Sequence, residues 1–110
     1  GTIMQEDVAV KIVLLNNKFL GMVRQWQQLF FDKRYSNTPM VNPDFIKVAD
    51  GYGIAGKKVL DRPNLEGAVE EMLNHKGPYL LEVSIEKEDN VFPMVATGAS
   101  VSEVILEAAK

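Results

Sequence analysis

Two adjacent asparagines, Asn16 and Asn17, followed closely by Gly21, form the part of this sequence best suited to bind a ligand. An asparagine side-chain carbonyl is a hard oxygen donor of the kind that Mg²⁺ accepts beside substrate phosphates. A helix is predicted to begin at Gly21, and the unpaired amide groups of a helix N-terminus favour phosphate. The alternative interpretation is that Asn16 and Asn17 merely turn the chain and cap that helix.

Other polar residues carry weaker chemical signals. His75 is the only histidine, and it lies at the predicted end of a helix, where a cation complements the helix dipole. No partner for catalysis accompanies it, so a structural role is expected. The acidic residues 70–71 and the charged run 86–89 are expected to be solvated, because nothing indicates a site on which two carboxylates converge.

Composition limits the classes of function. The chain has 110 residues, with 46% hydrophobic and 25% charged side chains, which suits one globular domain. A net charge of −3 argues against nucleic acid as a partner. The absence of cysteine excludes disulfides, thiolate metal sites and cysteine nucleophiles. The apolar runs are too short to span a bilayer, so no membrane association is expected.

Periodicity and turn residues predict alternating strands and helices. Strands are expected at 8–15, 54–60 and 79–85, and the uninterrupted apolar character of the first predicts cover on both faces. Helices are expected at 21–30, at 42–52 with Asn42 as the cap, and from Asp61 to the Gly77-Pro78 pair. Ser100 and Glu103 form a capping box for a short terminal helix.

This order predicts an α/β fold with a parallel sheet and right-handed crossovers. Ligands of such sheets bind beyond the carboxyl ends of the strands. Asn16 and Asn17 follow the first strand directly, so they are expected at that edge.

The segment 15–27, Leu-Asn-Asn-Lys-Phe-Leu-Gly-Met-Val-Arg-Gln-Trp-Gln, resembles the thiamine-diphosphate enzymes. Within them it is most similar to the large catalytic subunits of the acetolactate synthase (acetohydroxyacid synthase) family. The Asn-Asn pair occurs across the superfamily, whereas Gly-Met-Val with Gln-Trp, and Pro-Met-Val near the end, are specific to the FAD-containing anabolic branch. The resemblance continues through residues 34–36, 42–45, 77–85 and 90–95.

The resemblance implies a three-layer, parallel-sheet thiamine-diphosphate-binding fold, truncated at its N-terminal side. Residues 1–110 would be the C-terminal portion of that domain, with a tail from about residue 94. The family's Gly-Asp-Gly motif, its catalytic glutamate and its FAD-binding domain are not in this sequence. No catalytic residue is therefore expected in the chain, and the chain alone is expected to be inactive.

The resemblance also assigns site residues. Magnesium would be held by the side chain of Asn17 and the backbone carbonyl of Phe19, and FAD would bind outside the chain. The cofactor-binding residues implied are Asn17, Phe19, Leu20, Gly21 and Met22. The substrate channel implied comprises Met22, Val23, Trp26, Phe30 and Thr97. Trp26 would favour 2-ketobutyrate as second substrate, whereas Thr97 stands where the family commonly has Ser or Ala.

The reaction implied by the resemblance joins two pyruvates, or pyruvate and 2-ketobutyrate, with loss of carbon dioxide. The products, 2-acetolactate or 2-aceto-2-hydroxybutyrate, serve the biosynthesis of valine, leucine and isoleucine. Implied partners are the rest of a large subunit, a second copy in a homodimer and a small regulatory subunit. The location would be cytoplasmic in a bacterium and organellar in a eukaryote.

Two alternatives remain open at this point. One is a sister thiamine-diphosphate enzyme of the pyruvate oxidase or glyoxylate carboligase type, against which the Gln25-Trp26 pair argues. The other is a non-catalytic α/β module that binds a nucleotide or a protein partner.

Overall fold

The computed structural model describes residues 1–107, which form two compact units. The sheet unit consists of Gly1–Asn17 and Val41–Ile85. The helix unit consists of Lys18–Met40 and the described residues from Glu86 onward. Each unit is described by itself below.

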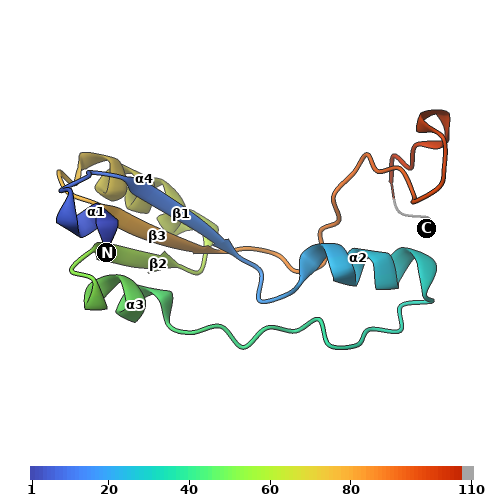
Figure 1. The fold of residues 1–110 in the computed structure, drawn as a ribbon, viewed down its shortest axis with the longest axis horizontal. Coiled ribbons are helices and arrows are strands. Elements are labelled where there is room, and N and C mark those ends of the chain that lie inside the picture. The colour runs from blue at the N-terminus through green and yellow to red at the C-terminus, as the bar shows by residue number, and fades with distance from the viewer. Residues whose placement is uncertain (108–110) are drawn as a thin grey trace. The chain divides into compact units, whose positions relative to one another are not determined.

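The sheet unit contains a three-stranded parallel sheet, which confirms the predicted α/β class (Figure 1). Its strands are β1 (Lys11–Asn16), β2 (Ala55–Val59) and β3 (Tyr79–Ser84), in the order β1-β3-β2. Asn16 is in register with Ser84, and Val59 with Val83. The carboxyl ends of the strands therefore meet at one edge of the sheet.

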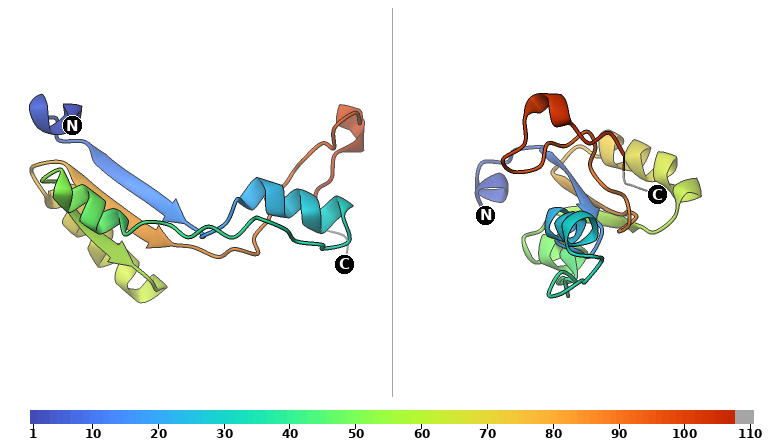
Figure 2. Two further views of the ribbon diagram at one scale, coloured as in Figure 1. Left: turned by 60° about the horizontal axis from the view of Figure 1, so that its bottom comes forward. Right: turned by 90° about the vertical axis from the view of Figure 1, so that its right-hand side faces the viewer.

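Helices cover both faces of this sheet. The helices that pack on its strands are α3 (Phe45–Gly51) and α4 (Leu65–Asn74), and the same unit also contains α1 (Thr2–Gln5) and the 3₁₀ helix η1 (Arg62–Asn64). Ile46 of α3 approaches Gly56, whereas Ala68 of α4 packs with Leu81. Gly56 is in register with Leu80, the neighbour of Leu81, and successive side chains point to opposite faces. The unit thus has three layers, with α3 and α4 on opposite sides of the sheet (Figure 2).

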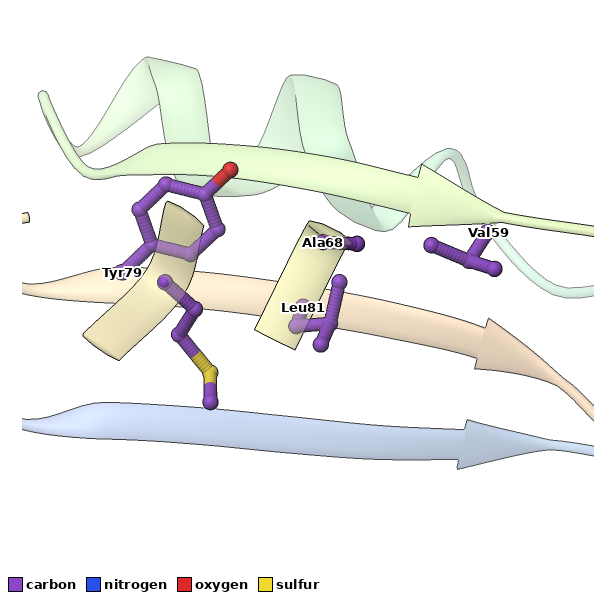
Figure 3. Packing of buried hydrophobic residues seen from close by; sticks show 5 residues of the cluster. Val59, Ala68, Tyr79 and Leu81 are labelled. Atoms are coloured by element: carbon purple, nitrogen blue, oxygen red, sulfur yellow. The ribbon is translucent and has the colours of Figure 1, made fainter. Parts of the chain in front are cut away.

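The hydrophobic core lies between the sheet and α4 (Figure 3). Leu81, at the centre of β3, is 0% exposed. On the other face, an added Cβ at Gly56 would lie 2.9 Å from the backbone oxygen of Leu80 and 3.4 Å from Ile46. Glycine at this position therefore lets α3 pack closely on the sheet. The buried core residues are Val59, Ala68, Met72, Tyr79 and Leu81.

Strand β1 differs from its expectation. Its apolar sequence predicts cover on both faces, but Val13 and Leu15 are 51% and 64% exposed within the described structure. The physical reason is the position of β1: among residues 1–107 it is an edge strand that pairs only with β3, and α4 packs on β2 and β3.

The helix unit is built around α2 (Gly21–Phe30), whose predicted bounds are confirmed. Before it, Phe19 forms an antiparallel bridge with Pro39, and Met40 N–H donates to the Lys18 carbonyl at 2.8 Å. The loop after α2 thus returns beside the segment that precedes it. Met94 and Ile105 form a second bridge in the tail.

Several predicted helix ends are corrected. Asp44 rather than Asn42 caps α3, because its Oδ1 accepts hydrogen bonds from the amides of Ile46 and Lys47, each at 3.2 Å. Helix α4 begins after η1 and ends at Asn74, before the predicted Gly77-Pro78 stop. The capping box at Ser100 is confirmed, but it begins only the 3₁₀ helix η2 (Val101–Glu103). Among residues 1–107, no helix is long and apolar enough to cross a membrane.

Candidate functional site

The predicted ligand-binding asparagines lie at the carboxyl edge of the sheet. Asn16 is the last residue of β1 and only 8% exposed, whereas Asn17 is half-buried. At the next residue, Lys18, the backbone φ of 58° turns the chain out of the strand direction. The structure therefore places Asn17 at the edge where parallel sheets bind ligands.

The side chain of Asn16 is fixed inside the sheet unit. Its Nδ2 donates to Glu82 Oε1 at 2.7 Å, and its Oδ1 accepts from Asn42 Nδ2 at 2.7 Å. Its backbone carbonyl accepts from the amide of Ile85 at 3.1 Å. Both polar atoms of this amide group are engaged within the protein, so Asn16 anchors the end of β1.

Glu82 is a buried carboxylate in the middle of an otherwise mostly apolar strand. It is 1% exposed, and its Oε1 also accepts from Lys58 Nζ at 2.9 Å. A buried charge needs such a partner to offset its lost hydration. Its other oxygen, Oε2, is buried and accepts no hydrogen bond within residues 1–107.

The residues after Asn17 lead into the N-terminus of α2. Phe19 lies in the bridge with Pro39, and its ring centroid is 5.6 Å from the Arg24 guanidinium carbon. Leu20 is the N-cap and contributes no side-chain cap, while Gly21 and Met22 are the first two helical residues. The structure thus arranges the predicted cofactor-binding residues 20–22 at one helix end, and their role stays a prediction.

A pocket of about 510 Å³ lies on the helix unit. Of the predicted channel residues, Val23 and Trp26 line it, whereas Met22, Phe30 and Thr97 are not among its lining residues. Phe30 instead packs on Trp26, with ring centroids 5.2 Å apart. The residues lining the pocket are Val23, Trp26, Gln27, Phe31 and Arg34. Apolar walls with one nearby cation suit a small organic anion.

Sequence reasoning missed the two residues that attach the tail to α2. Gln25 is 1% exposed and hydrogen-bonds the backbone of Val91, and Arg24 forms an ion pair with Glu88 at 2.9 Å. Both lie outside the apolar stripe that helical spacing predicts for this helix. The signal that could have found them is the tail itself, because backbone groups outside regular structure still need partners.

A second polar cluster lies towards the opposite, amino edge of the sheet. Glu71 accepts from Lys57 Nζ at 2.5 Å and from the Tyr79 hydroxyl at 2.8 Å. The bonds to Lys57 and then Tyr79 lower the pKa of Glu71, and burial followed by the Glu71 bond raises the pKa of Tyr79 to about 12.

Tyr79 begins β3, and the ring of His75 meets its ring edge-on, with centroids 5.4 Å apart. Because this edge is not the ligand-binding edge of a parallel sheet, the cluster serves stability. The contact also supports the structural role expected for His75.

Comparison with known proteins gives the chain a family. Residues 1–83 match the model described as "Thiamine pyrophosphate enzyme, C-terminal TPP binding domain". The chain is 51% identical over 106 residues to the acetolactate synthase isozyme 2 large subunit of Escherichia coli K12, covering 96% of this chain and 19% of that protein.

Two fungal proteins are also similar. The mitochondrial acetolactate synthase of Schizosaccharomyces pombe is 45% identical, over 96% of this chain and 16% of its own length. The mitochondrial acetolactate synthase catalytic subunit of Saccharomyces cerevisiae is 46% identical, over 93% of this chain and 15% of its own length. The chain therefore spans only a small part of the length of the curated relatives it matches.

Proposed function

Because the chain belongs to the thiamine pyrophosphate enzymes, through their C-terminal TPP-binding domain, we propose that it is part of a catalytic subunit of the acetolactate synthase type. Such a subunit joins two pyruvates, or pyruvate and 2-ketobutyrate, with loss of carbon dioxide. Similarity to acetolactate synthase large subunits over nearly the whole chain supports this reaction over that of a sister enzyme.

In this proposal, Asn17 and Phe19 hold a magnesium ion that bridges to the diphosphate of the cofactor. Their amide and backbone oxygens are the hard, neutral donors that Mg²⁺ accepts when it shares ligands with phosphate. Within residues 1–107 no cluster of three or more His, Cys, Asp or Glu side chains could hold a metal. The donor set therefore fits a magnesium ion held partly by the cofactor, and not an all-protein metal cage.

The remaining residues of the site have binding roles. Leu20, Gly21 and Met22 would line the cofactor at the start of α2, where unpaired helix amides favour negative charge. When bound, thiamine diphosphate supplies the electron sink for decarboxylation and carbon–carbon bond formation. The chain's own residues would hold and orient the cofactor.

The pocket on the helix unit is proposed as part of the substrate channel. Trp26 forms an apolar wall that would favour the extra methylene of 2-ketobutyrate over pyruvate as second substrate. Val23 lines the same pocket, and Met22, Phe30 and Thr97 are proposed as further channel residues. Replacing Trp26 with Leu is expected to reduce the preference for 2-ketobutyrate over pyruvate as second substrate. The rate of the reaction with pyruvate alone should fall less.

Partners and location complete the proposal. The rest of the large subunit, a second copy and a small regulatory subunit are proposed partners, and FAD is proposed to bind outside this chain. The isolated chain, mixed with pyruvate, thiamine diphosphate and Mg²⁺, is expected to yield no acetolactate. The location is proposed to be the cytoplasm in a bacterium or an organelle in a eukaryote.

The observation that carries this proposal is the position of Asn17, directly after β1 at the carboxyl edge of the sheet. In the full-length subunit, Asn17→Ala should weaken Mg²⁺-dependent thiamine diphosphate binding about tenfold or more, which corresponds to about 1.4 kcal/mol. Calorimetry measures this, with Asn74→Ala on the exposed end of α4 as the matched control.

Product analysis of the wild-type subunit separates the alternatives. Acetolactate from pyruvate supports the proposal. An oxidised two-carbon product, or consumption of glyoxylate instead of pyruvate, would identify a sister enzyme. Absence of any Mg²⁺-dependent thiamine diphosphate binding would instead leave a non-catalytic module.

A further inference from the structure

We propose that Glu82 is a positioning residue that acts through Asn16 to orient Asn17 for metal binding. This inference rests on the proposed function, in which Asn17 holds magnesium. All three residues belong to the sheet unit. Glu82 itself is buried on β3 and is not proposed to touch the metal or the cofactor.

The first step is that Glu82 fixes which way the Asn16 amide points. A carboxylate only accepts hydrogen bonds, so the group facing Glu82 Oε1 at 2.7 Å must be the NH₂ of Asn16. Oδ1 of Asn16 then points the other way and accepts from Asn42 Nδ2, also at 2.7 Å. The side chain therefore has one allowed orientation.

The second step is that the backbone of Asn16 is held as well. Its carbonyl accepts from the Ile85 amide at 3.1 Å, just beyond the end of β3. The peptide that joins Asn16 to Asn17 is planar, so fixing this carbonyl also fixes the position of the Asn17 amide nitrogen. The bond to Ile85 therefore restrains where the Asn17 residue starts, at the end of β1.

The third step is that the Glu82 arrangement suits positioning better than stability. A buried carboxylate loses its hydration, and apolar residues of similar volume often serve stability as well or better. Here Lys58, whose side chain is 40% exposed, neutralises the charge from the solvent side at 2.9 Å. Oε2 is buried without a hydrogen bond inside residues 1–107, which costs stability. What the charge adds is a short, charge-assisted bond to Asn16.

The fourth step is the connection to α3. Asn42 precedes the Asp44 cap by two residues and donates to Asn16. The start of α3 and the ends of β1 and β3 are thereby joined through one amide group. Support of this kind behind a metal ligand commonly contributes to metal affinity.

The test uses the full-length subunit and two measurements. One is the dissociation constant of Mg²⁺ at saturating thiamine diphosphate, measured by calorimetry, and the other is the melting temperature without cofactor. Asn16→Asp places two carboxylates together and removes the donor to Glu82. We expect it to weaken Mg²⁺ binding about tenfold or more, within the range usual for supporting residues, with little change in KM for pyruvate.

Glu82→Gln separates charge from hydrogen bonding. The carbonyl oxygen of the new glutamine can still accept from Asn16 and Lys58. We therefore expect a smaller loss of Mg²⁺ affinity than in Asn16→Asp. Glu82→Ala removes the acceptor, and it should weaken Mg²⁺ binding as much as Asn16→Asp does. Glu70→Gln makes the same chemical change on the exposed side of α4 and should leave Mg²⁺ affinity unchanged.

A double-mutant comparison excludes a merely structural role. If Asn16 and Glu82 act through Asn17, then Glu82→Ala should add little further loss of Mg²⁺ affinity to Asn17→Ala. Equal Mg²⁺ affinity of wild type, Glu82→Ala and Asn16→Asp, or full additivity with Asn17→Ala, would overturn the inference. Should Asn16→Asp fail to fold, Glu82→Gln and Asn42→Ala give the same comparison.

A failure of the proposed function would give a different result from a failure of this inference alone. In that case the wild-type subunit itself shows no Mg²⁺-dependent thiamine diphosphate binding. The inference fails alone when the wild type binds and the Glu82 variants bind equally well.

Discussion

The side chain of Gln25 pairs with the backbone of Val91 in both directions. Its Nε2 donates to the Val91 carbonyl at 2.9 Å, and its Oε1 accepts from the Val91 amide at 2.7 Å. Gln25 thus gives Val91 the two bonds that a neighbouring strand would give. The residue before the pocket-lining Trp26 therefore holds the tail segment against α2.

Gln25→Glu is expected to destabilise the helix unit by about 1–3 kcal/mol, because a buried carboxylate cannot donate to the Val91 carbonyl. Trp26 is the only tryptophan and lies on the same helix, so its fluorescence during urea unfolding reports this change. Gln5→Glu, at an exposed position in α1, is the matched control. Unchanged unfolding of Gln25→Glu would contradict the pairing.

Arg24→Lys should also destabilise the helix unit, by about 1–2 kcal/mol. The Arg24 guanidinium carbon lies 4.4 Å from the centre of the Tyr35 ring, and its Nη2 pairs with Glu88 at 2.9 Å. A lysine ammonium cannot stack on the ring and keep the same ion pair.

The matched control is Arg34→Lys. Arg34 lies 3.9 Å from Asp32, and both side chains are largely exposed. An exposed pair of this kind contributes about 0–1 kcal/mol, so a small change in the free energy of unfolding is expected. Equal effects of the two substitutions would argue against a special role for the Arg24 contacts.

Local patterns predicted the elements better than the contacts between them. Apolar spacing gave the bounds of α2, and the runs of apolar residues located all three strands to within a few residues. These signals are local because each depends on neighbours in the sequence. The exposed face of β1 was mispredicted because an apolar run does not state which strand lies at the sheet edge.

The contacts that hold the Asn16 side chain could not be predicted from local pattern. Asn42 and Asp44 both suit a helix cap, and the sequence alone favoured Asn42. In the structure the Asn42 amide donates instead to Asn16, 26 residues away, and Glu82 accepts from Asn16 across 66 residues. Such contacts depend on strand order and register, which periodicity does not give. The binding roles of Asn17 and Phe19 remain predictions.

Leu81→Ala is expected to destabilise the sheet unit by about 2–5 kcal/mol, because it opens a cavity in a fully buried position. Leu81 is 0% exposed and packs in the core between the sheet and α4. Leu73→Ala, at a residue of α4 that is 64% exposed, is the control, with an expected change within about 0.5 kcal/mol. Denaturant unfolding measures both, and comparable losses would contradict this description of the core.

Glu71→Gln should lower the melting temperature at neutral pH, and the difference from wild type should shrink in acid. The bonds to Lys57 and Tyr79 lower the pKa of Glu71 below its ordinary value of 4.5. Its stabilisation is therefore present above that value and is lost as the pH falls through the lower, folded-state pKa. Melting curves from neutral pH to about pH 3 test this, and a constant difference would contradict it.

Tyr79→Phe tests the same cluster, with Glu71 and Lys57, at alkaline pH. Burial and the bond to Glu71 raise the pKa of Tyr79 from 10.0 to about 12, so the folded state keeps a proton that the unfolded state releases. The stabilisation from Tyr79 is then complete below pH 10.0 and is lost as the pH rises towards about 12. In a tyrosinate absorbance titration, the difference between wild type and Tyr79→Phe should have its midpoint near 12. A midpoint near 10.0 would mean that the hydroxyl is neither buried nor bonded to Glu71.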